Sequence, residues 1–205
     1  MTTTTTSAYA ESAARFATYT HSLTLTVLKG EGSYRHLQFG KRGAVGWFEI
    51  VTWPGYLTIN GDCSRFTFGR VGDDAFRLFR QPDINPGYWV QYSGGDESRA
   101  RSYSGDLLRA ELVRQVDAAK AKFPGLQEEF AKFLEDADLD TSREDALSEA
   151  DQFEHWPPLA DRLRDTFRFV GLDTDDWEDW DTHYIRVCHA IRWGIGQYDD
   201  SKATR

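Results

Sequence analysis

The chain of 205 residues is long enough for one sizeable hydrophobic core or two small ones. Hydrophobic residues make up 40% of it and charged residues 28%, a balance typical of a globular protein, and no apolar run reaches the roughly 20 residues of a membrane helix. Cys63 and Cys188 are too few for a disulfide framework and form no C-x-x-C pair. We therefore interpret both as buried small hydrophobic residues.

The formal net charge of −9 is unevenly distributed. Residues 1–100 hold ten Lys and Arg against nine Asp and Glu, whereas residues 101–205 hold fourteen against twenty-four. The acid is densest from Glu135 to Asp181, with seventeen Asp and Glu and four Arg. This charge disfavours direct binding to a nucleic-acid backbone. Two interpretations remain: a surface that imitates nucleic acid toward a basic partner, or ordinary solvated helix faces.

The N-terminal half has the pattern of a β-protein. Residues 1–20 are predicted to be a disordered leader, because the chain starts with a threonine-rich tract that lacks the basic and apolar parts of a secretory signal. From residue 23 to residue 70 apolar residues alternate with period two between glycine-bearing turns, which predicts an antiparallel meander of about five strands. Pro54-Gly55 suits a type II turn and Asn60-Gly61 a type I′ hairpin turn.

The C-terminal half has helical periodicity. A short helix after Asp73-Asp74 and an aromatic loop over residues 83–89 lead to a Gly- and Ser-rich linker that ends near residue 100. Further helices are predicted from the spacing of apolar residues and from their caps. They cover residues 106–123, a segment from residue 126, a segment after Thr141-Ser142, one that starts at Pro157-Pro158, and a final helix capped by Asp181.

These patterns predict an α+β fold. An antiparallel β-sheet half over residues 21–100, with the short helix and the aromatic loop, is packed with an acidic half over residues 101–205 that contains about five to six helices. We expect the two halves to form one domain.

Several familiar chemistries are disfavoured. The chain lacks a G-x-G-x-x-G turn, a Walker phosphate loop, an H-E-x-x-H zinc helix and a G-x-S-x-G elbow. Residues 173–176 begin like a calcium loop, but Glu178 stands where that loop needs glycine. His183, Cys188 and His189 have an unsuitable helical spacing for zinc. We therefore expect neither a cofactor nor a metal.

A group of charged and aromatic residues in the N-terminal half is the first candidate site. Antiparallel pairing can bring strand ends to one side of a sheet. Arginine can hold a phosphate with two parallel hydrogen bonds, tryptophan can stack on a base, and histidine with aspartate can transfer a proton. The alternative is that the arginines pair with carboxylates, the tryptophan supports a turn and the histidine is an ordinary sheet residue. The group comprises Arg35, His36, Trp53, Asp62 and Arg70.

Two further places carry candidate side chains. Tyr88 and Trp89 are adjacent aromatics in the loop over residues 83–89 and can add stacking surface. His189 lies on the apolar final helix between Arg186 and Arg192, where it is either a hydrogen-bonded core histidine or a base.

Four segments carry a family resemblance: Tyr34–Phe39, Val51–Leu57 followed by Gly61-Asp62, Ile84–Trp89 and Cys188–Tyr198. Together they resemble a protein family that many bacteriophages and prophages encode, over most of the chain from about residue 21. The resemblance brings no catalytic residues with it. It implies a phage accessory protein, acting in the cytoplasm of the infected bacterial host.

The leading hypothesis follows from this resemblance and from the residues of the N-terminal half. The protein would counter bacterial anti-phage defence by binding and sequestering a small anionic, nucleotide-like immune signal. Arg35 and Arg70 would hold phosphate, Trp53 and Trp89 would stack on the base, and Tyr88 would contribute. A binding protein of this kind needs no membrane and no nucleic acid, and it can be a homo-oligomer.

Two alternatives belong to other classes of protein. The first is an acidic inhibitor, of anti-CRISPR or anti-restriction type, whose C-terminal half imitates nucleic acid and occupies a host defence nuclease or effector. The second is a hydrolase of the nucleotide signal, such as a phosphodiesterase, that would use His36 or His189 with Asp62.

Overall fold

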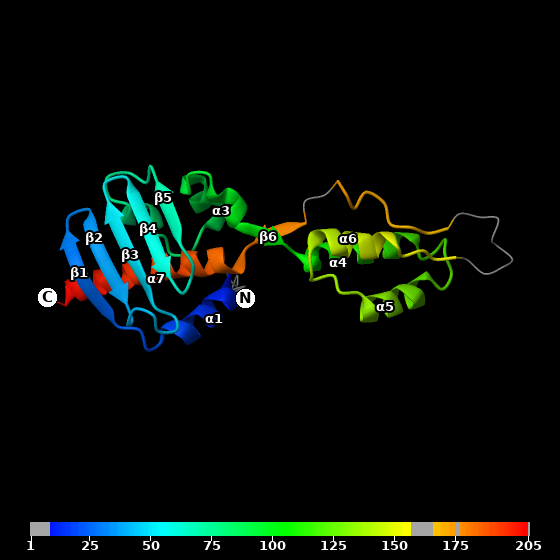
Figure 1. The fold of residues 1–205 in the computed structure, drawn as a ribbon, viewed down its shortest axis with the longest axis horizontal. Coiled ribbons are helices and arrows are strands. Elements are labelled where there is room, and N and C mark those ends of the chain that lie inside the picture. Colours follow the sequence, from blue (N-terminus) through cyan, green and yellow to red (C-terminus); the bar gives the residue numbers. More distant parts are fainter. Residues whose placement is uncertain (1–8, 157–165, 175–176, 205) are drawn as a thin grey trace, which may run out of the picture. The chain divides into compact units, whose positions relative to one another are not determined.

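The computed structural model describes residues 9–156, 166–174 and 177–204. The chain forms two compact units (Figure 1). Unit 1 contains residues 1–101 and 180–205, and unit 2 contains residues 102–179. Each unit has a hydrophobic core made of its own residues. The N-terminal sheet followed by helices confirms the α+β fold class.

Unit 1 is built on a five-stranded antiparallel sheet, as the period-two pattern predicts. The strands lie in the sheet in the order in which they occur along the chain, so each is paired with its sequence neighbour. This is the simplest meander, and short turns are enough to connect it. The strands are β1 (Leu25–Glu31), β2 (Tyr34–Phe39), β3 (Phe48–Trp53), β4 (Tyr56–Gly61) and β5 (Phe66–Gly69).

One predicted turn is confirmed and one is wrong. Gly55 has φ +83°, the left-handed conformation that a type II turn requires of glycine at its third position, and it joins β3 to β4. Asn60 and Gly61, in contrast, belong to β4, where they pair with Glu49 and Phe48. The Asn60 amide donates a hydrogen bond to Glu49 across the strands, so the chain turns only after Gly61.

The apolar side of the sheet packs on the long helix α7 (Thr182–Ala203) (Figure 1). Asp181 begins this helix as predicted, since its Oδ1 accepts hydrogen bonds from the backbone N–H groups of His183 and Tyr184. Gly194 allows the close approach, because a Cβ atom there would lie 2.9 Å from Ile50 and 3.0 Å from Phe39. The short helices α2 (Phe76–Phe79) and α3 (Pro86–Trp89) and the 3-10 turns η1 (Val90–Tyr92) and η2 (Asp96–Arg99) complete the unit.

The N-terminal segment differs from the predicted leader. Residues 10–20 form helix α1 (Ala10–Thr20), and only residues 1–8 lie outside the described part of the chain there. Phe16 of this helix is buried and its ring lies 5.8 Å from His189 and 6.3 Å from Trp193. Four alanines, Glu11 and Arg15 favour a helix here, and the packing of Phe16 on α7 adds the tertiary contact that a short helix needs.

Unit 2 is helical and has an aromatic core. Its helices are α4 (Gly105–Ala119), α5 (Leu126–Asp136) and α6 (Arg143–Asp151). Both of its connections to unit 1 run through a two-stranded ribbon of β6 (Arg101–Tyr103) and β7 (Glu178–Trp180). Its core contains Phe123, Phe130, Phe153, Phe167, Phe169 and Trp177.

The sequence predicts a helix that starts at Pro157-Pro158. Residues 157–165 of this segment lie outside the described part of the chain. After it the chain is extended, because Phe167 and His155 exchange two backbone hydrogen bonds of 3.1 Å. Within the ranges described, no helix is both long and apolar enough to cross a membrane.

Candidate functional site

The second side of the unit 1 sheet is polar and exposed. Period-two alternation that sends Leu37, Ile50 and Leu57 toward α7 necessarily sends their neighbours to the opposite side. We call this side the open face, and Figure 1 views it with α7 behind the sheet. Strands of this kind, apolar on one side and polar on the other, are typical of antiparallel sheets with one solvated face.

Three aromatic residues cross the open face in a row. Trp53 and Tyr56 are cross-strand partners on β3 and β4, and their rings are stacked at 5.2 Å with an interplanar angle of 16°. Because Arg35 of β2 pairs with Thr52 of β3, Tyr34 is the next neighbour of Trp53 on the same side. The side chains of Tyr34, Trp53 and Tyr56 are 52%, 36% and 42% exposed. We call these three residues the aromatic row.

Local structure explains why the row is flat and open. The Pro54-Gly55 turn fixes the register that sets Trp53 opposite Tyr56. On β5 the partner of Tyr56 is Gly69, where a Cβ atom would lie only 3.0 Å from the tyrosine ring. Glycine at this position therefore leaves room for the Tyr56 ring to lie over the neighbouring strand.

Two basic residues lie near the strands that carry the row, Lys29 on β1 and Arg70 after β5. The ammonium group of Lys29 is 5.8 Å from the centre of the Tyr34 ring. Arg70 is exposed and directly follows β5. Hydrogen bonds of Gly55 with Gly72 and Val71 hold this segment beside the β3–β4 turn. The φ of Arg70 is +61°, and a left-handed conformation costs a residue other than glycine about 1 kcal/mol. Such outliers are concentrated at functional sites.

A polar network lies on the open face beyond the row. Glu49 is almost completely buried and accepts hydrogen bonds from His36 Nε2 (2.9 Å), Arg42 (2.9 Å) and Asn60 (3.3 Å). Burial raises the pKa of Glu49, but the three donors outweigh burial and hold the pKa below its usual value. The carboxylate therefore stays ionised and fixes His36 and Arg42 on the surface.

The structure places the predicted ligand-binding residues in different environments. Arg35 lies on the α7 side, 9% exposed, with two hydrogen bonds to Asp74 (2.7 and 3.3 Å). Trp89 is fully buried against Phe79. The Tyr88 hydroxyl is hydrogen-bonded to Tyr92. Of the five residues, Trp53 and Arg70 lie at the same end of the sheet, where the segment after β5 is hydrogen-bonded to the β3–β4 turn.

The three candidate catalytic residues are not brought together. His36 lies on β2, and Asp62 stabilises a turn by accepting a hydrogen bond from the Gly46 N–H. His189 is buried on α7 and hydrogen-bonded to the Ser12 hydroxyl at 2.9 Å. Burial, assisted by the charge of Arg192, lowers the pKa of His189 to about 4. This geometry is that of a neutral core histidine.

Neither metal nor thiol chemistry finds support among the described residues. They contain no group of three or more His, Cys, Asp or Glu side chains that could hold a metal ion. Both cysteines are buried, and burial raises the pKa of the Cys63 thiol to about 12. A thiol with such a pKa is not a nucleophile at neutral pH.

Residue patterns alone missed three parts of the site. Tyr34, Tyr56 and Glu49 each stand one position from a buried strand residue, so alternation marks them as outward-facing. Their grouping depends on the register of β2, β3 and β4, which cannot be derived from the residue pattern alone. Comparison of the chain with protein-family models, curated proteins and solved structures finds no match.

Proposed function

We propose that this protein binds a small anionic, nucleotide-like ligand on the open face of the unit 1 sheet, and that it thereby sequesters an immune signal of an infected bacterium. The observation that supports the ligand class is the aromatic row, with Lys29 beside Tyr34 and with Arg70 in the segment that is hydrogen-bonded to the β3–β4 turn. The resemblance of four sequence segments to a phage-encoded family supports the role against host defence.

The chemistry of the open face suits a base and a phosphate. An aromatic side chain that stacks on a base contributes about 1–3 kcal/mol, and exposed aromatics on a sheet are a known platform for bases. The basic side chains of Lys29 and Arg70 would hold phosphate oxygens. Unit 2 carries twenty-one Asp and Glu against nine Lys and Arg, a formal charge of −12, which leaves +3 on unit 1. An anion is therefore attracted to unit 1 and repelled by unit 2.

Binding is favoured over hydrolysis. A hydrolase needs an acid or base within hydrogen-bond reach of the reacting group, and His36, Asp62 and His189 lie on separate elements. The Glu49 carboxylate already accepts hydrogen bonds from three donors. The ligand should consequently be recovered unaltered after the protein is denatured.

The test is a thermal-shift and tryptophan-fluorescence titration with cyclic mononucleotides, cyclic dinucleotides and adenosine-diphosphate-ribose. A ligand at about 100 times its dissociation constant adds roughly 2.7 kcal/mol of stability, which gives a clear shift of the melting temperature. Mass spectrometry of the released ligand then separates binding from hydrolysis. A panel in which no compound shifts the melting temperature would contradict the proposal.

The site is tested with matched variants. Trp53→Ala should weaken binding at least tenfold, because it removes the central stacking surface. Trp156→Ala is the control, since Trp156 is 58% exposed but belongs to unit 2. Arg70→Gln, with Arg77→Gln on the exposed side of α2 as its control, tests the phosphate contact. If Trp53→Ala and Trp156→Ala bind the ligand with equal affinity, the ligand does not bind on the open face.

A further inference from the structure

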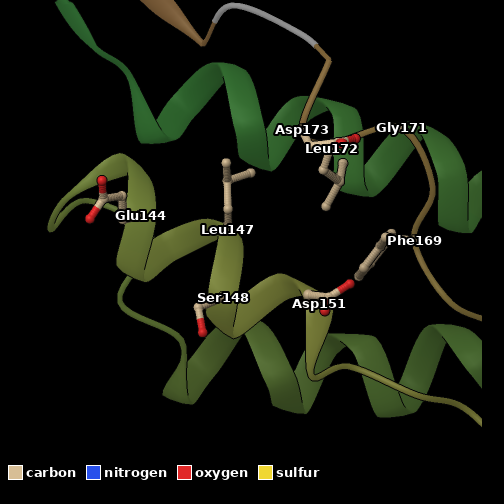
Figure 2. Close-up of a pocket in the computed structure, with 8 residues that line it drawn as sticks. All are labelled: Glu144, Leu147, Ser148, Asp151, Phe169, Gly171, Leu172 and Asp173. Atoms are coloured by element: carbon tan, nitrogen blue, oxygen red, sulfur yellow. The ribbon is translucent and has the colours of Figure 1, made fainter.

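Unit 2 contains a groove of about 580 Å³ between α6 and the segment of residues 169–173. Figure 2 shows Leu147 on α6 and Leu172 on the facing segment pointing into the same space, with Phe169 beside Asp151 at its other end. The groove lies within one unit, so it is formed by that unit's own packing.

The floor of the groove is apolar. Phe169 and Leu172 belong to the aromatic core and are 8% exposed, whereas Leu147 is only partly covered. The reason lies in α6, whose fully buried residues are Ala146 and Ala150. These small side chains hold the helix close to the core, and Leu147 beside them keeps part of its surface accessible in the groove.

The rim of the groove is acidic. Glu144, Asp151 and Asp173 border the floor, and in the part of the chain that the structure describes none of them has an ion-pair or hydrogen-bond partner. Other acidic residues of the unit do have partners: Glu154 pairs with Arg168 and Glu111 with Arg114. These three carboxylates have no partner among the residues with described positions, and they lie around an apolar floor in a unit of charge −12. They therefore repel one another and attract cations.

We propose that this groove docks a basic amphipathic helix of a partner protein. Leucine-like side chains at positions i, i+3, i+4 and i+7 of the partner would pack on Leu147 and on the exposed edges of Phe169 and Leu172. Lysine or arginine residues beside them would pair with the rim. The nine residues of α6 extend about 13 Å, which matches two to three turns of a docked helix. A nucleic acid or an acidic peptide is repelled, and a purely polar cation leaves the floor uncovered.

This surface is distinct from the open face of unit 1 and does not depend on the proposed nucleotide site. It also gives the acidic half a more specific role than imitation of nucleic acid, because a phosphate-like surface needs charge alone. The groove combines charge with an apolar floor, and recognition should depend on both.

The experiment uses the full chain, labelled with ¹⁵N, and a synthetic 14-residue helix-forming peptide of leucine and lysine. Amide shifts are expected for residues 144–151 and 169–173. A second peptide of equal charge, with glutamine in place of leucine, should bind at least tenfold more weakly. Equal binding of the two peptides, equal binding of spermine, or shifts confined to other parts of unit 2 would overturn the proposal.

Matched variants separate the groove from the general charge of the unit. Asp151→Asn combined with Asp173→Asn should weaken binding of the leucine peptide at least tenfold. Glu135→Gln combined with Asp136→Asn removes the same charge from an exposed part of α5 and should change the affinity less than twofold. All four side chains are exposed, so both variants should fold, which their amide spectra will show. If the two double variants weaken binding equally, the peptide is held by the general charge of unit 2 and not by the groove, and the proposal is overturned.

Discussion

At the scale of single residues, Arg35 shows how a side chain suited to phosphate becomes structural. Its guanidinium lies 4.4 Å from the Phe76 ring and makes two hydrogen bonds to Asp74, which also accepts a hydrogen bond from the Phe76 N–H. A nearly buried charge is tolerated only when it is paired in this way. The sequence shows the arginine and the aromatic residues. Whether the arginine faces α7 or the open face depends on its odd or even position along β2, which sets the side of the sheet.

Asp74→Asn should destabilise unit 1 at neutral pH by about 2–3 kcal/mol. The change leaves the Arg35 charge unpaired, and the cost is below that of a fully buried pair because Asp74 is 29% exposed. Urea unfolding at pH 7 measures it. Asp73→Asn, at the exposed neighbouring position, is the control. It should change the free energy of unfolding by less than about 0.5 kcal/mol, as is typical of surface substitutions.

The same pair predicts a pH dependence. Burial alone would raise the pKa of Asp74, but the hydrogen bonds and charge of Arg35 outweigh it and hold the pKa below its usual value. A carboxylate with a lowered pKa in the folded state stabilises the fold above its unfolded pKa of about 3.9 and ceases to do so as the pH falls through the folded pKa. The difference between wild type and Asp74→Asn should therefore shrink below pH 4. A difference that stays constant down to pH 2 would contradict this account.

At the scale of elements, one titratable histidine lies in the contact of α1 with α7. The His189 imidazole is hydrogen-bonded to the Ser12 hydroxyl and stacked on the Phe16 ring, so it contacts two residues of α1 while it is neutral. The pKa of His189, lowered to about 4 by burial and by Arg192, lies below the roughly 6.5 of an unfolded histidine. Between these values the unfolded chain binds a proton that the folded protein does not bind, so stability falls as the pH is lowered from 6.5 to 4.

His189→Gln should remove most of this pH dependence. The full effect of the histidine amounts to about 3 kcal/mol, given 1.36 kcal/mol for each unit of pKa difference. Unfolding free energies at pH 7, 5.5 and 4.5 measure the slope, and His183→Gln, on an exposed position of the same helix, should retain the wild-type slope. Identical slopes for the two variants would show that another group titrates in this range.

Elements with strong periodicity were predictable and those that depend on tertiary contacts were not. The apolar stripe and the Asp181 cap predicted α7, and alternation with glycine turns predicted the sheet. Helix α1 has one large buried apolar residue, Phe16, which packs on α7 in a contact between distant parts of the chain. The same holds for the aromatic row: its residues were visible, but the register that joins Tyr34, Trp53 and Tyr56 is a property of the folded sheet.

At the scale of the whole molecule, the chain organises its charge by unit. Unit 1 has two chain segments, with unit 2 inserted between Arg101 and Trp180, and the division leaves +3 on unit 1 and −12 on unit 2. Mutual repulsion within unit 2 is reduced when salt screens its carboxylates, over a distance of about 10 Å at 0.1 M. The two proposed sites, for an anion on the sheet and for a basic helix in the groove, are therefore compatible in one chain, because the proposed ligands have opposite charge.

Unit 1 should fold without unit 2. All described residues of its core lie outside the range 102–179. Where the two chain segments of unit 1 meet, the Asp181 N–H donates a hydrogen bond to the Ala100 carbonyl, and the Arg101 guanidinium lies 4.1 Å from the centre of the Trp180 ring. Residues 101 and 180 can therefore be joined by Asn-Gly, a sequence that favours a tight hairpin turn. The shortened chain should unfold cooperatively, keep the amide spectrum of the sheet over residues 25–69 and retain nucleotide binding, while binding of the leucine peptide is lost. A shortened chain without a cooperative transition would mean that unit 1 requires unit 2 for its stability.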